Sequence, residues 1–186
     1  MGTDDKGNSP ELLELIRGCA RQERSAQRKL YERFSSAMYA VCVRYVGNRE
    51  NAKDVLQEGF LVVFDKIGTF KGEGSFEGWM RKIFINASLM YIRRNDALKF
   101  SEEIETVPVF EMGLDTYSAI EQMNAKQIMS LVGEMPAGFR SVFNLYVIEG
   151  YSHSEIAAML GITEGSSRSQ LSRGKNWLQE RLKQYI

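Results

Sequence analysis

The hydrophobic residues of this chain recur at spacings of three and four positions and do not alternate with polar residues. Such spacing is typical of α-helices that bury one face, and only three prolines interrupt the chain. No stretch has the alternation of a half-buried strand. The pattern therefore predicts an all-α protein made of two small helical domains, each with four helices.

Four helices that form a bundle are predicted in the N-terminal half. The first begins at Ser9-Pro10, because serine can cap a helix and proline fits its first position. The second ends at Gly47-Asn48, where glycine supplies a left-handed cap. The third spans about residues 50–67, and the fourth begins near Ser75. The predicted core faces are Ala52, Val55, Leu56, Phe60, Val63, Phe64 and Ile67 in the third helix, and Phe76, Trp79, Met80, Ile83, Ala87 and Met90 in the fourth.

The helical period is lost between residues 96 and 118. This segment is acidic and contains Pro108, so we predict a flexible, extended linker. Helices resume at about residue 119 and continue to the end of the sequence. The expected domains are therefore 10–95 and 119–186, joined by the linker 96–118.

The segment from Gly150 to Thr163 carries the strongest local signal. Ser152 and Glu155 have the spacing of a capping box, which starts a short helix. Gly161 permits a tight turn, and Thr163 can cap a second helix that runs to about residue 183. Two helices joined in this way predict a helix-turn-helix, whose second helix enters the major groove of DNA.

The second helix of the predicted helix-turn-helix begins with a polar and basic run. Serine hydroxyls and arginines in the first turns can reach base edges and phosphates, while Leu171, Leu178 and Leu182 keep the opposite face in a core. A solvated helix of an ordinary bundle is the alternative, but it leaves the coincidence of glycine turn, capping box and basic turns unexplained. The candidate DNA contacts are Ser167, Arg168, Ser169, Ser172, Arg173 and Lys175.

The distribution of charge is more informative than the total, in which 24 basic and 24 acidic side chains cancel. Residues 1–96 carry a net +3, residues 97–120 carry −4, residues 121–160 carry −2 and residues 161–186 carry +3. An acidic middle thus hides two mildly basic pieces, one of which is the predicted DNA-binding helix.

The two cysteines, Cys19 and Cys42, lie on apolar helical faces without a closely spaced partner. They are typical of reduced core cysteines rather than of a redox pair, and we expect a reducing, cytoplasmic environment. The apolar runs are far shorter than the roughly 20 residues of a membrane span, and residues 1–9 lack a signal-peptide core. Nothing in the sequence calls for a metal or another cofactor.

A second stripe runs beside the core face of the third helix. Asp54, Gln57, Glu58 and Leu61 fall at i, i+3, i+4 and i+7, and spacing alone leaves open whether they face solvent or a partner. Paired carboxylates also serve acid–base and metal chemistry, but no histidine or further carboxylate cluster accompanies them. The only histidine, His153, lies in the first turn of a short helix and is expected to be exposed rather than catalytic.

A basic line on the fourth helix adjoins a glycine-rich loop with aromatic neighbours. This combination suits an unstacked single strand, because phosphates need cations and bases need a pocket or platform. The aromatic residues Phe76 and Trp79 fit the core better than a base-stacking platform. The line consists of Lys82, Asn86, Leu89 and Arg93, and the loop of Lys71, Gly72, Glu73, Gly74 and Ser75.

Taken together, these segments resemble the extracytoplasmic-function group of bacterial RNA polymerase sigma factors from about Leu12 to Leu182. The helix-turn-helix is similar to the group's minus-thirty-five-recognition domain. A second motif is similar to its polymerase-binding and minus-ten-recognition domain. That motif comprises residues 54–60, Phe70, Phe76, Trp79, Ile83, Asn86, Arg93 and Arg94.

The resemblance implies a role for each candidate surface. Asp54, Gln57, Glu58 and Leu61 would dock on the coiled coil of the largest catalytic subunit of core RNA polymerase. The loop 71–75 would capture a flipped non-template base, with Lys82, Asn86 and Arg93 at the melted minus-ten element. Ser167, Arg168, Ser169, Ser172 and Arg173 would meet the minus-thirty-five bases, and Lys175 a phosphate. An anti-sigma protein is an implied partner, and the linker would thread toward the RNA exit channel.

Two positions depart from the pattern of the group. Met90 stands where relatives often carry a polar residue, four positions after Asn86. Gly74 is an extra glycine in the loop and changes the pocket that the loop can form.

The expected function is therefore that of an alternative sigma factor, a non-enzymatic protein that binds core polymerase and directs promoter-specific initiation. Binding energy alone would drive melting of the duplex. The alternative is a helix-turn-helix regulator that acts without polymerase and binds duplex DNA tightly by itself. A helical hydrolase that uses Asp54 and Glu58 is a third class, which would require a metal-dependent activity.

Overall fold

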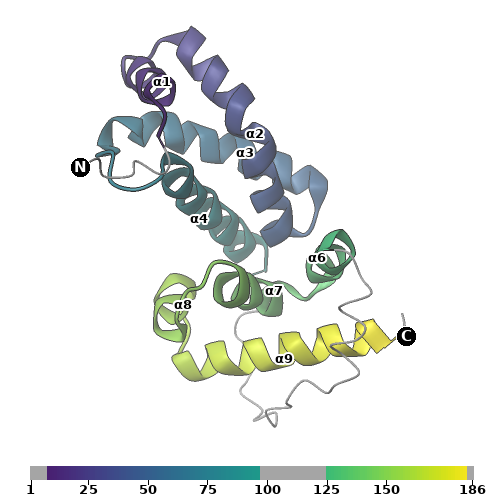
Figure 1. Ribbon diagram of the computed structural model, residues 1–186. Helices are drawn as coiled ribbons and strands as arrows, with labels where there is room; N and C mark the ends of the chain where they lie inside the picture. The colour runs from purple at the N-terminus through teal and green to yellow at the C-terminus, as the bar shows by residue number, and fades with distance from the viewer. Residues whose placement is uncertain (1–7, 97–124, 184–186) are drawn as a thin grey trace, which may run out of the picture. The chain divides into compact units, whose positions relative to one another are not determined.

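The computed structural model describes residues 8–96 and 125–183 of the 186-residue chain. Within these ranges every regular element is a helix, which confirms the all-α prediction (Figure 1). The chain divides into two compact units, residues 1–43 with 48–90 and residues 44–47 with 91–186. Apart from residue 96, which ends a helix, the predicted linker lies outside the described residues.

Helix α1 (Pro10–Ala20) begins, and helix α2 (Arg24–Val46) ends, at the expected signals. The hydroxyl of Ser9 accepts a hydrogen bond from the Leu12 amide at 3.2 Å and so caps α1. Gly47 follows α2 with φ of +75°, a conformation that suits glycine. Asn48 then caps the next helix by accepting from two backbone amides. The local signals predicted these boundaries because each cap is made within a few residues of sequence.

Helices α3 (Arg49–Lys66) and α4 (Phe76–Asp96) cross at a point of very close approach, and the short helix η1 (Ile67–Thr69) follows α3. A Cβ atom added to Gly59 would lie 2.3 Å from the Phe84 ring. The ring therefore occupies the space that glycine leaves open. Much of the core of this unit consists of Leu30, Phe34, Met38, Val55, Phe60, Phe76 and Phe84.

The predicted core face of α4 is correct in part. Phe76 and Met80 are fully buried, but Met90 is 52% exposed and Leu89 beside it is 3% exposed. Hydrophobic residues such as Leu89 and Met90 are neighbours in the sequence, and the helical period alone does not decide which of them points inward. The packing of Phe84 against Gly59 settles the rotation of the helix.

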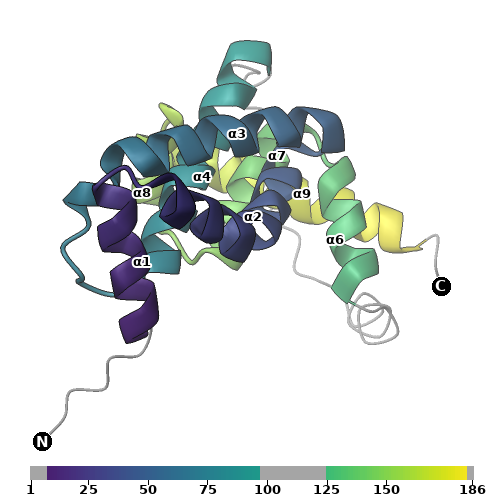
Figure 2. The ribbon, with the colours of Figure 1, turned by 90° about the horizontal axis from the view of Figure 1, so that it is seen from above.

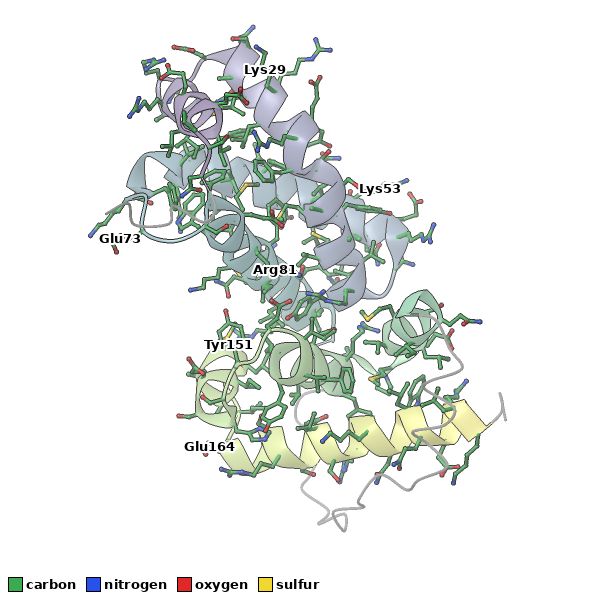
Figure 3. The ribbon with its side chains drawn as sticks, viewed as in Figure 1. Lys29, Lys53, Glu73, Arg81, Tyr151 and Glu164 are labelled. Atoms are coloured by element: carbon green, nitrogen blue, oxygen red, sulfur yellow. The ribbon has the colours of Figure 1, made fainter. Side chains whose placement is uncertain are left out.

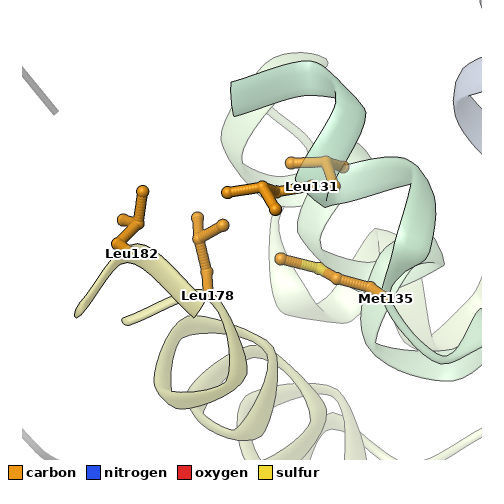
Figure 4. Close-up of a cluster of buried hydrophobic side chains, with 5 residues drawn as sticks. Leu131, Met135, Leu178 and Leu182 are labelled. Carbon is orange, nitrogen blue, oxygen red and sulfur yellow. The ribbon is translucent and has the colours of Figure 1, made fainter. Parts of the chain in front are cut away.

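The second unit contains α6 (Ala125–Glu134), α7 (Ala137–Phe143), the π-helical segment η3 (Asn144–Ile148), α8 (His153–Leu160) and α9 (Glu164–Leu182). Figures 1 and 2 show α6 beside the C-terminal half of α9. Figure 4 shows the cluster that joins them, in which side chains of both helices meet. Its buried members are Leu131, Val132, Met135, Leu178 and Leu182.

Small residues let α7 approach α9 closely. A Cβ atom on Gly174 would lie 3.3 Å from that of Phe139, and one on Gly138 would lie 3.0 Å from the Gln170 side-chain oxygen. The buried Arg140 side chain donates to the backbone oxygens of Gly133 and Met135, at 2.8 and 2.7 Å. The Gly133 carbonyl lies in the last turn of α6 and the Met135 carbonyl just after it, so both would otherwise lack helical partners. The arginine thus fixes the turn between α6 and α7.

Both cysteines are buried and unbonded to each other, as expected for core cysteines. Burial, with a smaller contribution from Glu23, raises the pKa of Cys19 to about 11. Burial raises the pKa of Cys42 to about 12. No helix in residues 8–96 or 125–183 has the length and apolarity that a membrane crossing requires.

Candidate nucleic-acid interface and docking surface

Helices α8 and α9 form the predicted helix-turn-helix. Ser152 and Glu155 make the capping box, in which each side chain bonds the other residue's backbone amide. Gly161 ends α8 with φ of +69°, and the Thr163 hydroxyl accepts from the Ser166 amide at 3.0 Å to cap α9. Each of these residues was predicted from spacing, because capping boxes and left-handed glycines act locally.

One polar contact between α8 and α9 lies on the inner side of this motif. The hydroxyl of Ser167 is 2.9 Å from Nδ1 of His153, and Ser167 is fully buried. The His153 ring stacks on Tyr146 with ring centroids 4.5 Å apart. The placement therefore corrects two expectations. His153 is half-buried rather than exposed, and Ser167 packs between helices and does not face outward.

The surroundings of His153 disfavour its charged form. Burial is the largest cause that lowers the pKa of its imidazole. The positive charges of Arg168 and Lys175 lower this pKa further, and Glu164 acts in the opposite direction. A neutral ring can share a hydrogen bond with Ser167 as either donor or acceptor. The contact with Ser167 is therefore kept when the imidazole is neutral.

The outer side of α9 presents the other candidate DNA contacts. The side chain of Arg168 is 61% exposed and forms an ion pair with Glu164 at 2.9 Å, one turn earlier. Ser169, Ser172, Arg173 and Lys175 are half-buried on the same helix. Glu164, labelled in Figure 3, lies at the start of α9. An exposed ion pair contributes little to stability, so Arg168 can exchange its carboxylate for a base or a phosphate.

The stripe on α3 is exposed along its whole length. Asp54, Gln57 and Glu58 face solvent, and Leu61 is 70% exposed, the highest value among the exposed large hydrophobic residues of the described ranges. A single exposed leucine is ordinary on a protein surface. Here it extends a row of two carboxylates and an amide, an arrangement that can contact a partner through both charge and apolar area.

The loop before α4 is exposed at all five candidate positions, Lys71 to Ser75. Gly72 and Gly74 have φ of +79° and +75°, which explains why glycine is used at both. Figure 3 shows Glu73 at the outer edge of this loop. The side-chain amide of Asn8, a residue outside the loop, donates a hydrogen bond to the Gly74 carbonyl. Sequence reasoning missed this contact. The contact joins residues 66 positions apart, so no local sequence pattern predicts it.

On α4, Lys82, Asn86 and Arg93 are exposed, as the basic line requires. Leu89 was assigned to the same line, but it is buried. The exposed Met90 is the residue between Asn86 and Arg93 on the surface. The line therefore presents a cation, an amide, a thioether and a second cation.

The aromatic residues near the loop form one cluster. Phe76 lies 5.1 Å from Phe70 and 5.4 Å from Trp79, measured between ring centroids. Phe76 is fully buried, which confirms its assignment to the core. Phe70 and Trp79 are half-buried and form its outer side.

Comparisons with known proteins match two separate parts of the chain. The family described as Sigma-70 region 2 matches residues 30–98, and the one described as Sigma-70, region 4 matches residues 125–178. The extracytoplasmic-function RNA polymerase sigma factor SigE of Mycolicibacterium smegmatis is 29% identical over 157 residues. That alignment covers 83% of this chain and 60% of the relative, so the chain spans less than two thirds of that protein.

A second relative matches over nearly its full length. The extracytoplasmic-function RNA polymerase sigma-E factor of Haemophilus influenzae is 23% identical over 177 residues, covering 90% of this chain and 93% of the relative. Among solved structures, the sigma factor RpoE of Bartonella quintana in complex with the anti-sigma factor NepR has a similar fold. The TM-score is 0.50 at 20% identity, over 84% of this chain and 96% of that one.

Proposed function

Since this chain belongs to the extracytoplasmic-function group of sigma-70 factors, we propose that it binds core RNA polymerase and directs promoter-specific initiation of transcription. The observation that carries the proposal is the order of the two matched regions on one chain, region 2 at residues 30–98 and region 4 at residues 125–178. A regulator that works without polymerase has no need of region 2. That alternative is therefore not favoured.

The surface proposed to dock on core polymerase is the α3 stripe of Asp54, Gln57, Glu58 and Leu61. Its support is the exposure of the three polar residues and the 70% exposure of Leu61. Carboxylates at an interface steer association with a basic partner, and an apolar side chain next to them adds buried area. We assign this stripe to the coiled coil of the largest catalytic subunit.

The test of the docking surface compares two double variants. Asp54→Ala with Glu58→Ala is expected to weaken binding to core polymerase on the order of tenfold or more, because two interfacial charges are lost. Glu32→Ala with Glu50→Ala is the matched control. It also removes two exposed carboxylates, which pair with Arg28 and Lys53. Equal affinity of both double variants for core polymerase would contradict the assignment.

The surface proposed to contact the minus-ten element comprises the loop 71–75 with Lys82, Asn86 and Arg93. All are exposed, and the three cations Lys71, Lys82 and Arg93 are suited to phosphates of a melted strand. The loop would hold a non-template base that has left the stack. Asn86 is suited to a base edge, because its amide both donates and accepts.

The surface proposed to read the minus-thirty-five element comprises Arg168, Ser169, Ser172 and Arg173, with Lys175 at a phosphate. Ser167 is left out because it is buried against His153. We further propose that the domains are residues 10–95 and 119–186, with residues 96–118 as the linker. Each domain would then contact one promoter element, and core polymerase would hold both.

Three further points belong to the same proposal. The chain acts by binding and carries out no chemical step of its own, so the energy for melting comes from contacts with DNA. It acts in the cytoplasm, where promoters and polymerase are found. An anti-sigma protein holds it inactive, which is supported by the Bartonella protein of similar fold that was solved in complex with such an inhibitor.

A further inference from the structure

Asn8, two residues before α1, makes two hydrogen bonds to the segment that leads into α4. Its side-chain nitrogen donates to the Gly74 carbonyl at 2.8 Å, and its side-chain oxygen accepts from the Phe76 amide at 2.9 Å. Asn8 is only 6% exposed. Both atoms of one buried amide are therefore used at the C-terminal end of the loop 71–75.

The Phe76 amide is the first backbone N–H of α4, which has no partner within the helix. The hydroxyl of Ser75 accepts from the Gly78 amide at 3.3 Å, so it caps a different group. Asn8 thus completes the N-terminus of α4 from a distant part of the sequence. Both bonds are partly or fully buried, and unmade hydrogen bonds at such a site are costly.

Gly74 is the point where Asn8 acts on the loop itself. Its φ of +75° is a conformation that other residues rarely adopt, and nothing lies within 4 Å of the place a Cβ atom would take. The loop is therefore open on this side. A carbonyl bond from Asn8 restrains the backbone there, while at the other end the Phe70 amide is tied to the Ile67 carbonyl at 3.2 Å.

We propose that Asn8 is a positioning residue for the loop 71–75, and that it sets which base the loop accepts at the minus-ten element. The inference rests on the proposed function of the loop. Asn8 does not touch DNA in this account. It acts by fixing the Gly74 carbonyl and hence the path of the exposed residues Lys71, Glu73 and Ser75.

Asn8→Asp separates the two bonds that Asn8 makes. Aspartate keeps an acceptor for the Phe76 amide, and a carboxylate is favourable at a helix N-terminus. It has no donor for the Gly74 carbonyl, which it would repel. The variant is therefore expected to destabilise the bundle less than Asn8→Ala does, while it releases the loop. Asn8→Ala removes both bonds, and Ser9→Ala removes only the neighbouring cap of α1.

The experiment uses the full chain bound to core polymerase and fork-junction DNA with a single-stranded minus-ten segment. Each of the four bases is placed in turn at every position of that segment. The position read by the loop is the one whose discrimination changes in Lys71→Ala and Glu73→Ala. There, Asn8→Asp is expected to lose about fivefold of discrimination, the contribution of one neutral hydrogen bond. Affinity for core should match that of Ser9→Ala, and the unfolding temperature should lie above that of Asn8→Ala.

Two results would overturn the proposal. Discrimination equal to wild type in Asn8→Asp would mean that the Gly74 bond does not position the loop, even if Asn8→Ala were unstable. A loss of affinity for all bases and for core in parallel would mean that Asn8 has only a general structural role. If instead Lys71→Ala and Glu73→Ala change discrimination nowhere, the proposed function of the loop fails, and this inference fails with it.

Discussion

Single side chains decide where the helices of this protein approach one another. Gly59 lets the Phe84 ring lie against the backbone of α3, and Gly174 does the same for Phe139 against α9. Interiors are close-packed, so one added methyl group must displace something. The rotation of α4, which hydrophobic spacing predicted only in part, depends on this fit.

Gly59→Ala is predicted to destabilise the first unit by about 1–3 kcal/mol, the usual cost of overpacking. The alanine would gain up to about 1 kcal/mol of helix propensity, but its Cβ would overlap the Phe84 ring. Urea unfolding followed by Trp79 fluorescence in a Trp177→Phe background measures the difference. Gly78→Ala is the control, because a Cβ there has only an ordinary contact with Ser75. Equal midpoints for the two variants would contradict the fit.

The half-buried His153 gives the helix-turn-helix a dependence on pH. Its pKa is lowered in the folded state, chiefly by burial, so the unfolded chain takes up the proton first as the pH falls. The contribution of neutral His153 to stability is therefore complete above the ordinary pKa of histidine. It is lost as the pH falls through that value toward the pKa of His153 in the folded state.

When the pH is lowered from about 7.5 to about 5.5, the unfolding temperature of the second unit should therefore fall more in wild type than in His153→Gln. Glutamine cannot titrate in this range but keeps a hydrogen-bonding group near Ser167. Trp177 fluorescence in a Trp79→Phe background follows this unit. The same fall in both proteins would show that the histidine has no part in the pH dependence.

At the scale of the helices, local signals predicted boundaries and long-range packing decided the rest. Ser9, Gly161 and Thr163 each act within four residues of their own position, so the sequence alone identified them. The roles of Asn8 and Ser167 come from partners 66 and 14 residues away, for which the sequence holds no period. The exposure of candidate residues agrees with the sequence where it follows from a helical stripe, as on α3, while their roles stay predictions.

We predict that side chains in the first turns of the recognition helix α9 read the base sequence of DNA and do not act through charge alone. Arg168→Ala should cost about 1–3 kcal/mol at one or two minus-thirty-five base pairs and little elsewhere. Arg181→Ala is a control on the same helix, since that guanidinium lies 4.8 Å from the Trp177 ring centroid near the other end. Holoenzyme binding to a set of singly substituted promoters measures both. A uniform loss across all sequences would make Arg168 a phosphate contact.

For the whole molecule, the modest charge of each unit favours DNA binding by both units together over binding by either one alone. Residues 161–186 carry a net charge of only +3, so few phosphates can be neutralised by the helix-turn-helix alone. We propose that the exposed stripe on α3 makes a separate contact to polymerase. In this account the polymerase holds both DNA-binding surfaces and so makes two weak contacts act together.

In vitro transcription from fragmented genomic DNA of the source bacterium, with start sites mapped, tests that account most directly. Core polymerase with the chain should produce a defined set of start sites that neither component gives alone. Asp54→Ala with Glu58→Ala should reduce all of them together, because it acts at docking and not at one promoter. If no start site depends on the chain, or if the chain alone binds the same fragments tightly, the protein does not act as a sigma factor.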